Sequence, residues 1–81
     1  MDKAQIIEKI NAFLVEDFEI EEGKLLPEAN FKKDLGIDSL DIVDVVVMVD
    51  KAFGVKIKAE DLRTVTTLQA FYDFIDAKLN G

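Results

Sequence analysis

The sequence contains no cysteine and no histidine, and these two absences remove most of the familiar catalytic and metal-binding chemistry. Without cysteine the chain can form neither a disulfide nor a thiolate metal site. Without histidine it cannot build a Ser-His-Asp triad, a Cys-His pair or the usual zinc sites. The sequence therefore indicates a protein that is not an enzyme and that has no metal site.

Basic residues are also scarce, with 10 Lys and Arg against 17 Asp and Glu, which gives a net charge of −7 at pH 7. Nucleic acids and anionic membranes are bound by basic faces, so neither is an expected partner. Proteins with basic patches are favoured instead, because opposite charges steer their approach. Hydrophobic residues make up 49% of the chain, enough for a core, so a disordered acidic tail is a poor interpretation.

Long apolar runs are missing as well. No segment could span a membrane, and the opening residues MDKAQIIEKI mix acid and base, unlike a signal peptide or an Arg-rich transit peptide. These features predict a soluble, cytoplasmic protein. With 81 residues the chain is one small domain at most, which we take as residues 1–81 and expect to be a monomer.

The first structural element predicted from the sequence is an amphipathic helix over residues 4–16, capped by Asp2. Its apolar residues recur at helical spacing: Ile6, Ile7, Ile10, Phe13 and Leu14. A long connection follows over residues 17–38, with the only proline, Pro27, and several turn formers. This connection is rich in apolar residues, which favours an ordered functional loop over a flexible linker.

A second helix is expected to start at Asp38 or Ser39 and to run to about Phe53. Asp38 and Asp41 have the spacing of a capping box with Asp in the place of Glu. Gly54 is placed to end this helix.

The rest of the chain predicts a short helical turn over residues 59–63 and a last long helix. Thr66 or Thr67 would cap that helix, which would run to about Leu79. The expected fold class is therefore all-α: a small four-helix bundle of three long helices and one short helix, with a long ordered loop between the first two.

The second helix has an unusual outer face. At about 100° per residue, its expected core face consists of Ile42, Val46, Val49 and Phe53, flanked by Val43, Val45 and Ala52. The opposite face consists of Asp41, Asp44 and Lys51 together with Leu40, Val47 and Met48. Apolar residues among carboxylates on an outer face favour a docking helix. The alternative is that a helical domain tolerates a few exposed apolar residues.

Ser39, the only serine, admits two interpretations. A serine at a helix start is commonly a cap. This one also follows a glycine-containing loop at the positive end of a helix, whose backbone N–H groups could accommodate a phosphate. Because the chain offers no general base, another enzyme would have to modify the serine.

The segment Leu35-Gly36-Ile37-Asp38-Ser39-Leu40-Asp41 resembles the attachment motif of acyl carrier proteins. The resemblance extends over nearly the whole chain, including the long loop with Phe31 and Asp34, the FGVKI stretch and the TVTTL stretch before the last helix. It implies that a 4′-phosphopantetheine arm, derived from coenzyme A, is attached to Ser39. It also implies that the arm carries acyl groups as thioesters between the enzymes of fatty-acid biosynthesis, and that Asp38 helps the modifying enzyme to recognise the site.

The same resemblance implies two further sets of residues. The face that meets partner enzymes would consist of Leu40, Asp41, Asp44, Val47 and Met48. The pocket for the acyl chain would be lined by Val43, Val46, Val49, Ile57, Leu62 and Leu68. The implied partners are a phosphopantetheinyl transferase and the acyl-transfer enzymes of fatty-acid or polyketide synthesis, docking through basic patches.

The sequence departs from the family pattern in ways that concern the partners. Asp50-Lys51-Ala52 stands where glutamates are usual, and Lys58-Ala59 replaces the usual proline and acid. Lys56, Lys58 and Arg63 make that region more basic than expected. A specialised carrier for a polyketide, aryl polyene, aminoacyl or lipid-modifying pathway is therefore an alternative, and an unmodified helical interaction domain is a more distant one.

Overall fold

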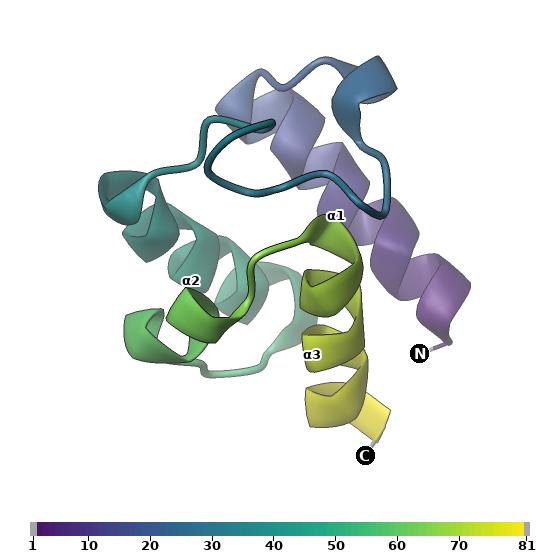
Figure 1. Cartoon of the computed structure of the whole chain (residues 1–81). Helices are drawn as coiled ribbons and strands as arrows, with labels where there is room; N and C mark the ends of the chain where they lie inside the picture. The colour runs from purple at the N-terminus through teal and green to yellow at the C-terminus, as the bar shows by residue number, and fades with distance from the viewer. Residues whose placement is uncertain (1, 81) are drawn as a thin grey trace.

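The computed structural model describes residues 2–80, and within that span the regular structure is entirely helical (Figure 1). The three α-helices are α1 (Lys3–Phe18), α2 (Ser39–Phe53) and α3 (Leu68–Asn80). Two short 3-10 helices, η1 (Glu22–Lys24) and η2 (Ala59–Thr64), lie in the connections. The predicted all-α bundle of three long helices and a short one is confirmed, and η1 is an additional single turn.

Helix α1 begins with the predicted Asp2 cap. The Asp2 carboxylate accepts a hydrogen bond from the Gln5 backbone N–H at 2.9 Å, and the Gln5 side chain accepts one from the Asp2 N–H at 3.1 Å. This reciprocal capping box satisfies two amides that the first turn would otherwise leave unpaired. The helix extends two residues further than expected and ends at Phe18, where Glu19 adopts a left-handed conformation.

Packing of α1 against α3 forms one side of the bundle, and the first turn of α1 lies beside the middle of α3 (Figure 1). The Lys3 ammonium forms an ion pair with the carboxylate of Asp73 on α3. The Tyr72 hydroxyl, also on α3, donates a hydrogen bond to the Asn11 side chain on α1. The side chain of Lys9 reaches the other neighbour: its ammonium donates to the Ala52 carbonyl at the end of α2, at 3.3 Å.

The long connection before α2 is held in place by backbone hydrogen bonds to the start of α3. Asn30 and Thr67 form an isolated antiparallel bridge, and the Leu68 N–H donates to the Ala29 carbonyl at 2.9 Å. The apolar side chains of this connection enter the core: Ile20, Ala29, Phe31, Leu35 and Ile37 are all buried. The prediction of an ordered loop is confirmed, because the loop supplies part of the core itself.

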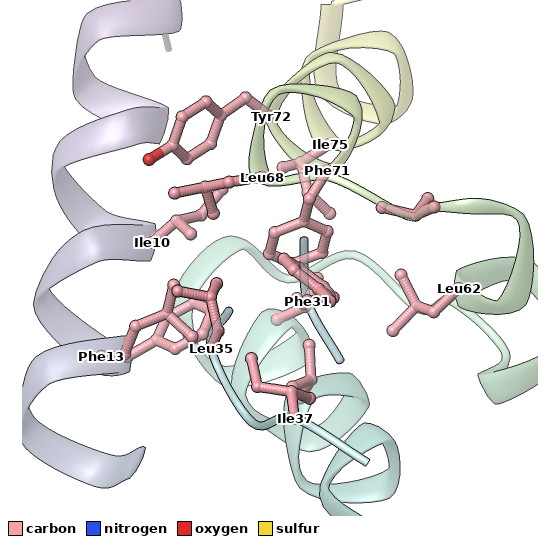
Figure 2. Close-up of a cluster of buried hydrophobic side chains, with 14 of the residues drawn as sticks. Ile10, Phe13, Phe31, Leu35, Ile37, Leu62, Leu68, Phe71, Tyr72 and Ile75 are labelled. Carbon is pink, nitrogen blue, oxygen red and sulfur yellow. The ribbon is translucent and has the colours of Figure 1, made fainter. Parts of the chain in front are cut away.

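The core centres on two aromatic rings from segments far apart in the chain. Phe31 from the loop and Phe71 from α3 meet edge to face, with ring centroids 5.1 Å apart. Figure 2 shows Leu62 and Ile37 pointing toward Phe31 from different sides. Among residues 2–80 the only buried side chain with a polar group is Tyr72, whose hydroxyl is hydrogen-bonded to Asn11, so apolar contacts hold this core together.

Helix α2 is rotated relative to the predicted wheel. Val45 and Val49 are fully buried and form the centre of its inner face, whereas Val46 is only half-buried. Met48, expected on the outer face, packs against the core, and Val43, expected near the core, is 56% exposed. The predicted end of the helix is confirmed: Gly54 closes it with φ 69°, a conformation that costs glycine little.

The last elements follow the prediction closely. The turn expected over residues 59–63 is η2, whose Leu62 is buried at 2% exposure and packs toward α2. Of the two threonines proposed as caps, Thr67 has this role, because its hydroxyl accepts from the Ala70 N–H at 3.2 Å. Leu68, Phe71 and Ile75 are buried on the inner face of α3, as the spacing predicted.

Candidate attachment site at Ser39

Ser39 is the first residue of α2, but the residue that caps the helix is Asp38. The Asp38 carboxylate accepts from the backbone N–H groups of Leu40 at 2.9 Å and Asp41 at 3.2 Å. The Asp41 side chain accepts in return from the Asp38 N–H at 3.2 Å, which completes the predicted capping box. The interpretation of Ser39 as the cap is therefore wrong.

The Ser39 hydroxyl is consequently available. Its side chain is exposed, and among the described residues it has no hydrogen-bond partner. A serine that stabilised the helix would use its oxygen to accept from the first-turn amides, and here Asp38 has taken that position. The Ser39 hydroxyl therefore lies at a fixed point of the surface and does not cap the helix.

The cap also changes one expectation about phosphate. The helix N-terminus was expected to offer its backbone N–H groups to a phosphate on Ser39. Two of these groups, at Leu40 and Asp41, already donate to the Asp38 carboxylate. A phosphate at Ser39 would therefore have to find its positive charge mainly elsewhere.

The backbone before Ser39 is fixed by burial on both sides of Gly36. Leu35 and Ile37 are buried, and the Ile37 N–H donates to the Phe31 carbonyl at 2.8 Å. Gly36 turns the chain between them with φ 70°, in the left-handed region that other residues adopt at a cost. The loop thus holds the serine in a defined position while its side chain faces outward.

A cleft with a volume of about 480 Å³ opens beside Ser39, between the loop, the start of α2, and the end of η2 with the segment after it. Its apolar lining comes from Phe31, Ile37, Ile42, Leu62 and Val65. Its charged lining comes from Lys32, Lys33, Arg63 and Asp38. We call this feature the cationic cleft, because three of its four charged side chains are positive.

The three cations of the cleft come from two segments. Lys32 and Lys33 lie on a tight turn whose backbone N–H groups both donate to the Asn30 side-chain oxygen, each at 2.9 Å. Arg63 lies on η2. Within residues 2–80 the one ion pair is Lys3–Asp73, so none of the three has a carboxylate within ion-pair distance.

The other side of Ser39 is acidic. A smaller hollow of about 240 Å³ lies between the end of α1 and the start of α2, and four of its eight lining residues are acids: Asp17, Glu19, Asp41 and Asp44. Beside it, three apolar side chains project from α2 at helical spacing and are 80%, 56% and 46% exposed: Leu40, Val43 and Val47. We call these three residues with Asp44 the outer face of α2.

The residues expected on the partner face differ in exposure. Leu40, Asp44 and Val47 are exposed, and Asp41 is half-buried within the capping box. Met48 is half-buried, with its side chain packed against the core, so it is less exposed than expected. Val43 lies beside Leu40 and Val47, since positions 40, 43 and 47 follow one face of a helix.

The residues expected to line an acyl pocket are mostly interior. Ile57, Leu62 and Leu68 are buried with Val49, and Val46 is half-buried. Val43 differs from the other five, because its side chain is 56% exposed on the outer face of α2 and does not lie in the interior. Leu62 alone of the six borders the cationic cleft.

Sequence reasoning missed most of the cleft beside Ser39. Its apolar walls include Phe31, Ile37, Ile42 and Val65, and its rim includes Lys32 and Lys33. The stretch NFKKDLGI mixes apolar and charged residues, and this pattern was the sequence signal for these walls and this rim. That signal gives no indication that Arg63, thirty positions further on, completes the same rim.

Groups with clearly shifted pKa values lie where α1 meets α3. The hydrogen-bonded Lys3 ammonium lowers the pKa of the Asp73 carboxyl, and the same contact raises the pKa of Lys3. Burial raises the pKa of the Tyr72 hydroxyl above its ordinary value of 10.0, and the hydrogen bond to Asn11 partly opposes this.

Residues 2–80 contain neither a membrane-spanning helix nor a cluster of side chains arranged for a metal ion. No helix in this part is long and apolar enough to cross a bilayer. No group of three or more acidic side chains in it is arranged to hold a metal ion.

A compact helical domain that presents one exposed serine hydroxyl, beside a cleft and on the edge of an acidic helix, has the form of a carrier domain. Comparison with known proteins supports this class. The family model described as "Phosphopantetheine attachment site" matches residues 8–75. The chain is 35% identical over 79 residues to the acyl carrier protein of Thermosynechococcus vestitus, covering 98% of both chains. It is 33% identical over 75 residues to the acyl carrier protein of Rubrobacter xylanophilus, covering 93% of both.

The chain belongs to the acyl carrier protein family, whose covalent group is 4′-phosphopantetheine. The residues around Ser39 fit that group. Within residues 2–80 the exposed hydroxyl has no hydrogen-bond partner, and the cleft beside it is within the size range of small-molecule sites. Its rim supplies cations for the phosphate, and its apolar walls match the methyl and methylene groups of the arm.

Proposed function

We propose that Ser39 is the attachment point of the phosphopantetheine arm and that the chain carries acyl intermediates of fatty-acid biosynthesis as thioesters. The observation that carries this proposal is the free state of the Ser39 hydroxyl. It is exposed at the start of α2, while Asp38 performs the capping that a serine there would otherwise perform. A side chain that does not cap the helix is available for modification.

The attachment reaction defines what the chain must supply. The Ser39 oxygen would attack the phosphorus of coenzyme A that is bonded to the pantetheine part. A new P–O bond forms, the phosphoanhydride bond breaks, and the adenosine bisphosphate leaves with the bonding electrons. The serine proton must go to a base, and no histidine is present to act as one. In this proposal the base belongs to the modifying transferase, and the chain contributes a positioned nucleophile.

Once attached, the arm would supply the thiol that this cysteine-free chain lacks. An acyl group held on a flexible tether replaces free diffusion by an effective concentration of roughly millimolar. The residues of the chain then have two tasks, to orient the arm and to select partners. In this proposal the chain is a carrier and the catalytic groups belong to its partners.

The outer face of α2 is the surface that we propose for partner docking. Asp44 is exposed beside Leu40, Val43 and Val47, so an anionic group adjoins an apolar patch. Carboxylates at the edge accelerate the encounter with a basic surface. Apolar side chains at the centre provide the contact area that is removed from water. The transferase and acyl-transfer enzymes with basic patches are the partners that this chemistry fits.

A specialised carrier remains the second candidate because of the basic residues near η2. Lys56, Lys58 and Arg63 lie in or before this short helix, and Arg63 borders the cleft beside Ser39. The two candidates share the arm and the attachment residue and differ in cargo. Rates of loading with malonyl groups and of elongation by fatty-acid synthesis enzymes would separate them, since a dedicated carrier for another pathway would be a poor substrate for elongation.

Intact mass spectrometry after incubation with coenzyme A and a phosphopantetheinyl transferase tests the attachment. We expect the wild type to gain one phosphopantetheinyl group and Ser39→Ala to gain none. Thr66→Ala is the matched control, because it removes a hydroxyl that lines the same cleft and should load normally. A wild type that stays unmodified with several transferases, or a Ser39→Ala variant that is modified, would contradict the proposal.

A further inference from the structure

The cationic cleft contains more positive charge than the arm alone would match. Its lining holds three cations, Lys32, Lys33 and Arg63, and one carboxylate, Asp38. That carboxylate already accepts two hydrogen bonds from the first turn of α2. The phosphodiester of an arm on Ser39 would bring one negative charge, which leaves positive charge on the rim without a partner.

The placement of these cations indicates where a second anion would lie. Lys32 and Lys33 stand on the turn after Asn30, and Arg63 stands on η2, so the cations come from two segments that border one apolar lining. Figure 2 shows Leu62, Phe31 and Ile37 of that lining close together in the core. A ligand on this surface would place methylene groups over the apolar side chains and a charged end at the rim.

The opposite side of Ser39 would repel the same ligand. There the hollow beside Gly36 is lined by Asp17, Glu19, Asp41 and Asp44, with no basic residue among its lining. An anionic tethered group is therefore directed toward the cationic cleft by attraction on one side and repulsion on the other. An uncharged alkyl group would experience neither this attraction nor this repulsion.

From this arrangement we infer that the cleft favours acyl groups that end in a carboxylate, which the cations of Lys32, Lys33 and Arg63 receive while the methylene groups rest on the apolar lining. The inference rests on the proposed attachment to Ser39 and adds the class of cargo. It distinguishes half-acid thioesters, derived from dicarboxylic acids, from plain saturated acyl groups. No covalent step beyond the attachment is involved.

The test compares two cargoes that differ only in charge. The transferase attaches to Ser39 the arm of a coenzyme A analogue in which an amine replaces the terminal thiol. That amine is already joined, as a stable amide, to a six-carbon diacid or to the monoamide of that diacid, each labelled with ¹³C at the far carbonyl. Intact mass spectrometry first establishes that one arm is present. Carbon NMR then follows the titration of the labelled carboxylate on the protein and on free pantetheine.

We expect the carboxylate to be about threefold more acidic on the protein than on free pantetheine, the size of effect that an exposed ion pair produces. The difference should disappear in the variant Lys32→Gln/Lys33→Gln/Arg63→Gln and at high salt, and it should persist in Lys51→Gln, an exposed cation of α2 that does not line the cleft. The amide signals of Lys33 and Arg63 should respond to the acid and not to the monoamide. Equal thermal unfolding of all variants would show that the changes are not caused by misfolding.

Three results would overturn the inference. One is a carboxylate with the same acidity on the protein and on free pantetheine. Another is a difference that survives the triple substitution. The third is a rim that responds to attachment of the bare arm and shows no further response to the acid, which would assign the cations to the phosphodiester alone. If no arm is attached to Ser39, seen by mass before any titration, the proposed function fails and the inference fails with it.

Discussion

The two surfaces that meet at Ser39 differ in shape and in charge. On one side, the apolar side chains Leu40 and Val47 project from the outer face of α2 beside Asp44. On the other, the cationic cleft is concave and has buried residues such as Leu62 and Phe31 in its walls. Side chains that project from a face can be buried in the surface of a partner. A cleft can instead hold a group that is tethered to the chain.

This difference indicates a division of labour around one residue. If both surfaces had the same charge, a phosphate on Ser39 would be attracted to both or repelled by both, and neither side would be preferred. Here the acids stand on the side that we assign to partners, and the cations stand on the side that we assign to the arm. Substitutions that change one surface and leave the other intact test this division of labour.

The largest difference in stability is expected when one leucine on each surface is replaced by alanine. Leu62→Ala removes a side chain that is 2% exposed in the wall of the cleft and should lower the free energy of unfolding by about 2–5 kcal/mol. Leu40→Ala removes one that is 80% exposed on the outer face and should change it by less than about 0.5 kcal/mol. Urea unfolding followed by circular dichroism measures both. Equal losses would show that the two surfaces do not differ in burial.

Reversing the charge of the outer face should slow modification. Asp44→Lys replaces an exposed anion next to the apolar patch, and the rate of loading by the transferase should fall roughly tenfold at low ionic strength. The loss should shrink at high salt, because screening removes steering between exposed charges. Glu8→Gln on α1 is the control and should load at the wild-type rate. If Asp44→Lys loads as fast as the wild type at low salt, docking does not use this face.

A smaller effect is expected where the two surfaces meet, at the helix cap. Asp38→Ala removes the oxygen that accepts from Leu40 and Asp41 and should cost about 1 kcal/mol of stability. Asp38→Asn keeps an oxygen acceptor and should recover most of that loss. Thermal unfolding compares the two variants. A fully stable Asp38→Ala would mean that another group, such as the Ser39 hydroxyl, can cap the helix in its place.

The smallest effect is expected in a region that borders neither surface. Because burial raises the pKa of Tyr72 above its ordinary value of 10.0, the folded state resists loss of that proton. The corresponding stability is present below pH 10 and is lost as the pH rises through the raised pKa. Tyr72→Phe should flatten this alkaline decline in a series of unfolding measurements. An unchanged decline in Tyr72→Phe would assign it to other groups.

The caps and ends of the helices were the part of the fold that the sequence could predict. Asp2, Asp38 and Gly54 act locally, through atoms three or four positions away, so their effect is visible in a short stretch of sequence. The rotation of α2 was not predictable in the same way. The run Val45-Val46-Val47-Met48-Val49 is apolar on all sides, and periodicity then gives no unique inner face.

The site was predicted to the same extent and for the same reason. Ser39, Asp38 and Leu40 follow from one contiguous motif, and the exposed Val47 follows from the helical spacing after it. The cationic cleft does not, because it joins the turn after Asn30 to Arg63 on η2 through the bridge between Asn30 and Thr67. Only the folded chain brings these segments together, and Lys32 and Lys33 read in isolation as ordinary solvated charges.

Amide chemical-shift changes between the apo and holo forms of the protein test the two-surface account most directly. The account predicts that attachment of the bare arm shifts the amides of Phe31, Lys33 and Arg63 in the cleft and leaves those of Val43 and Val47 on the outer face unchanged. Shifts confined to Val43 and Val47, or an arm that perturbs nothing beyond Ser39 and its immediate neighbours, would contradict it.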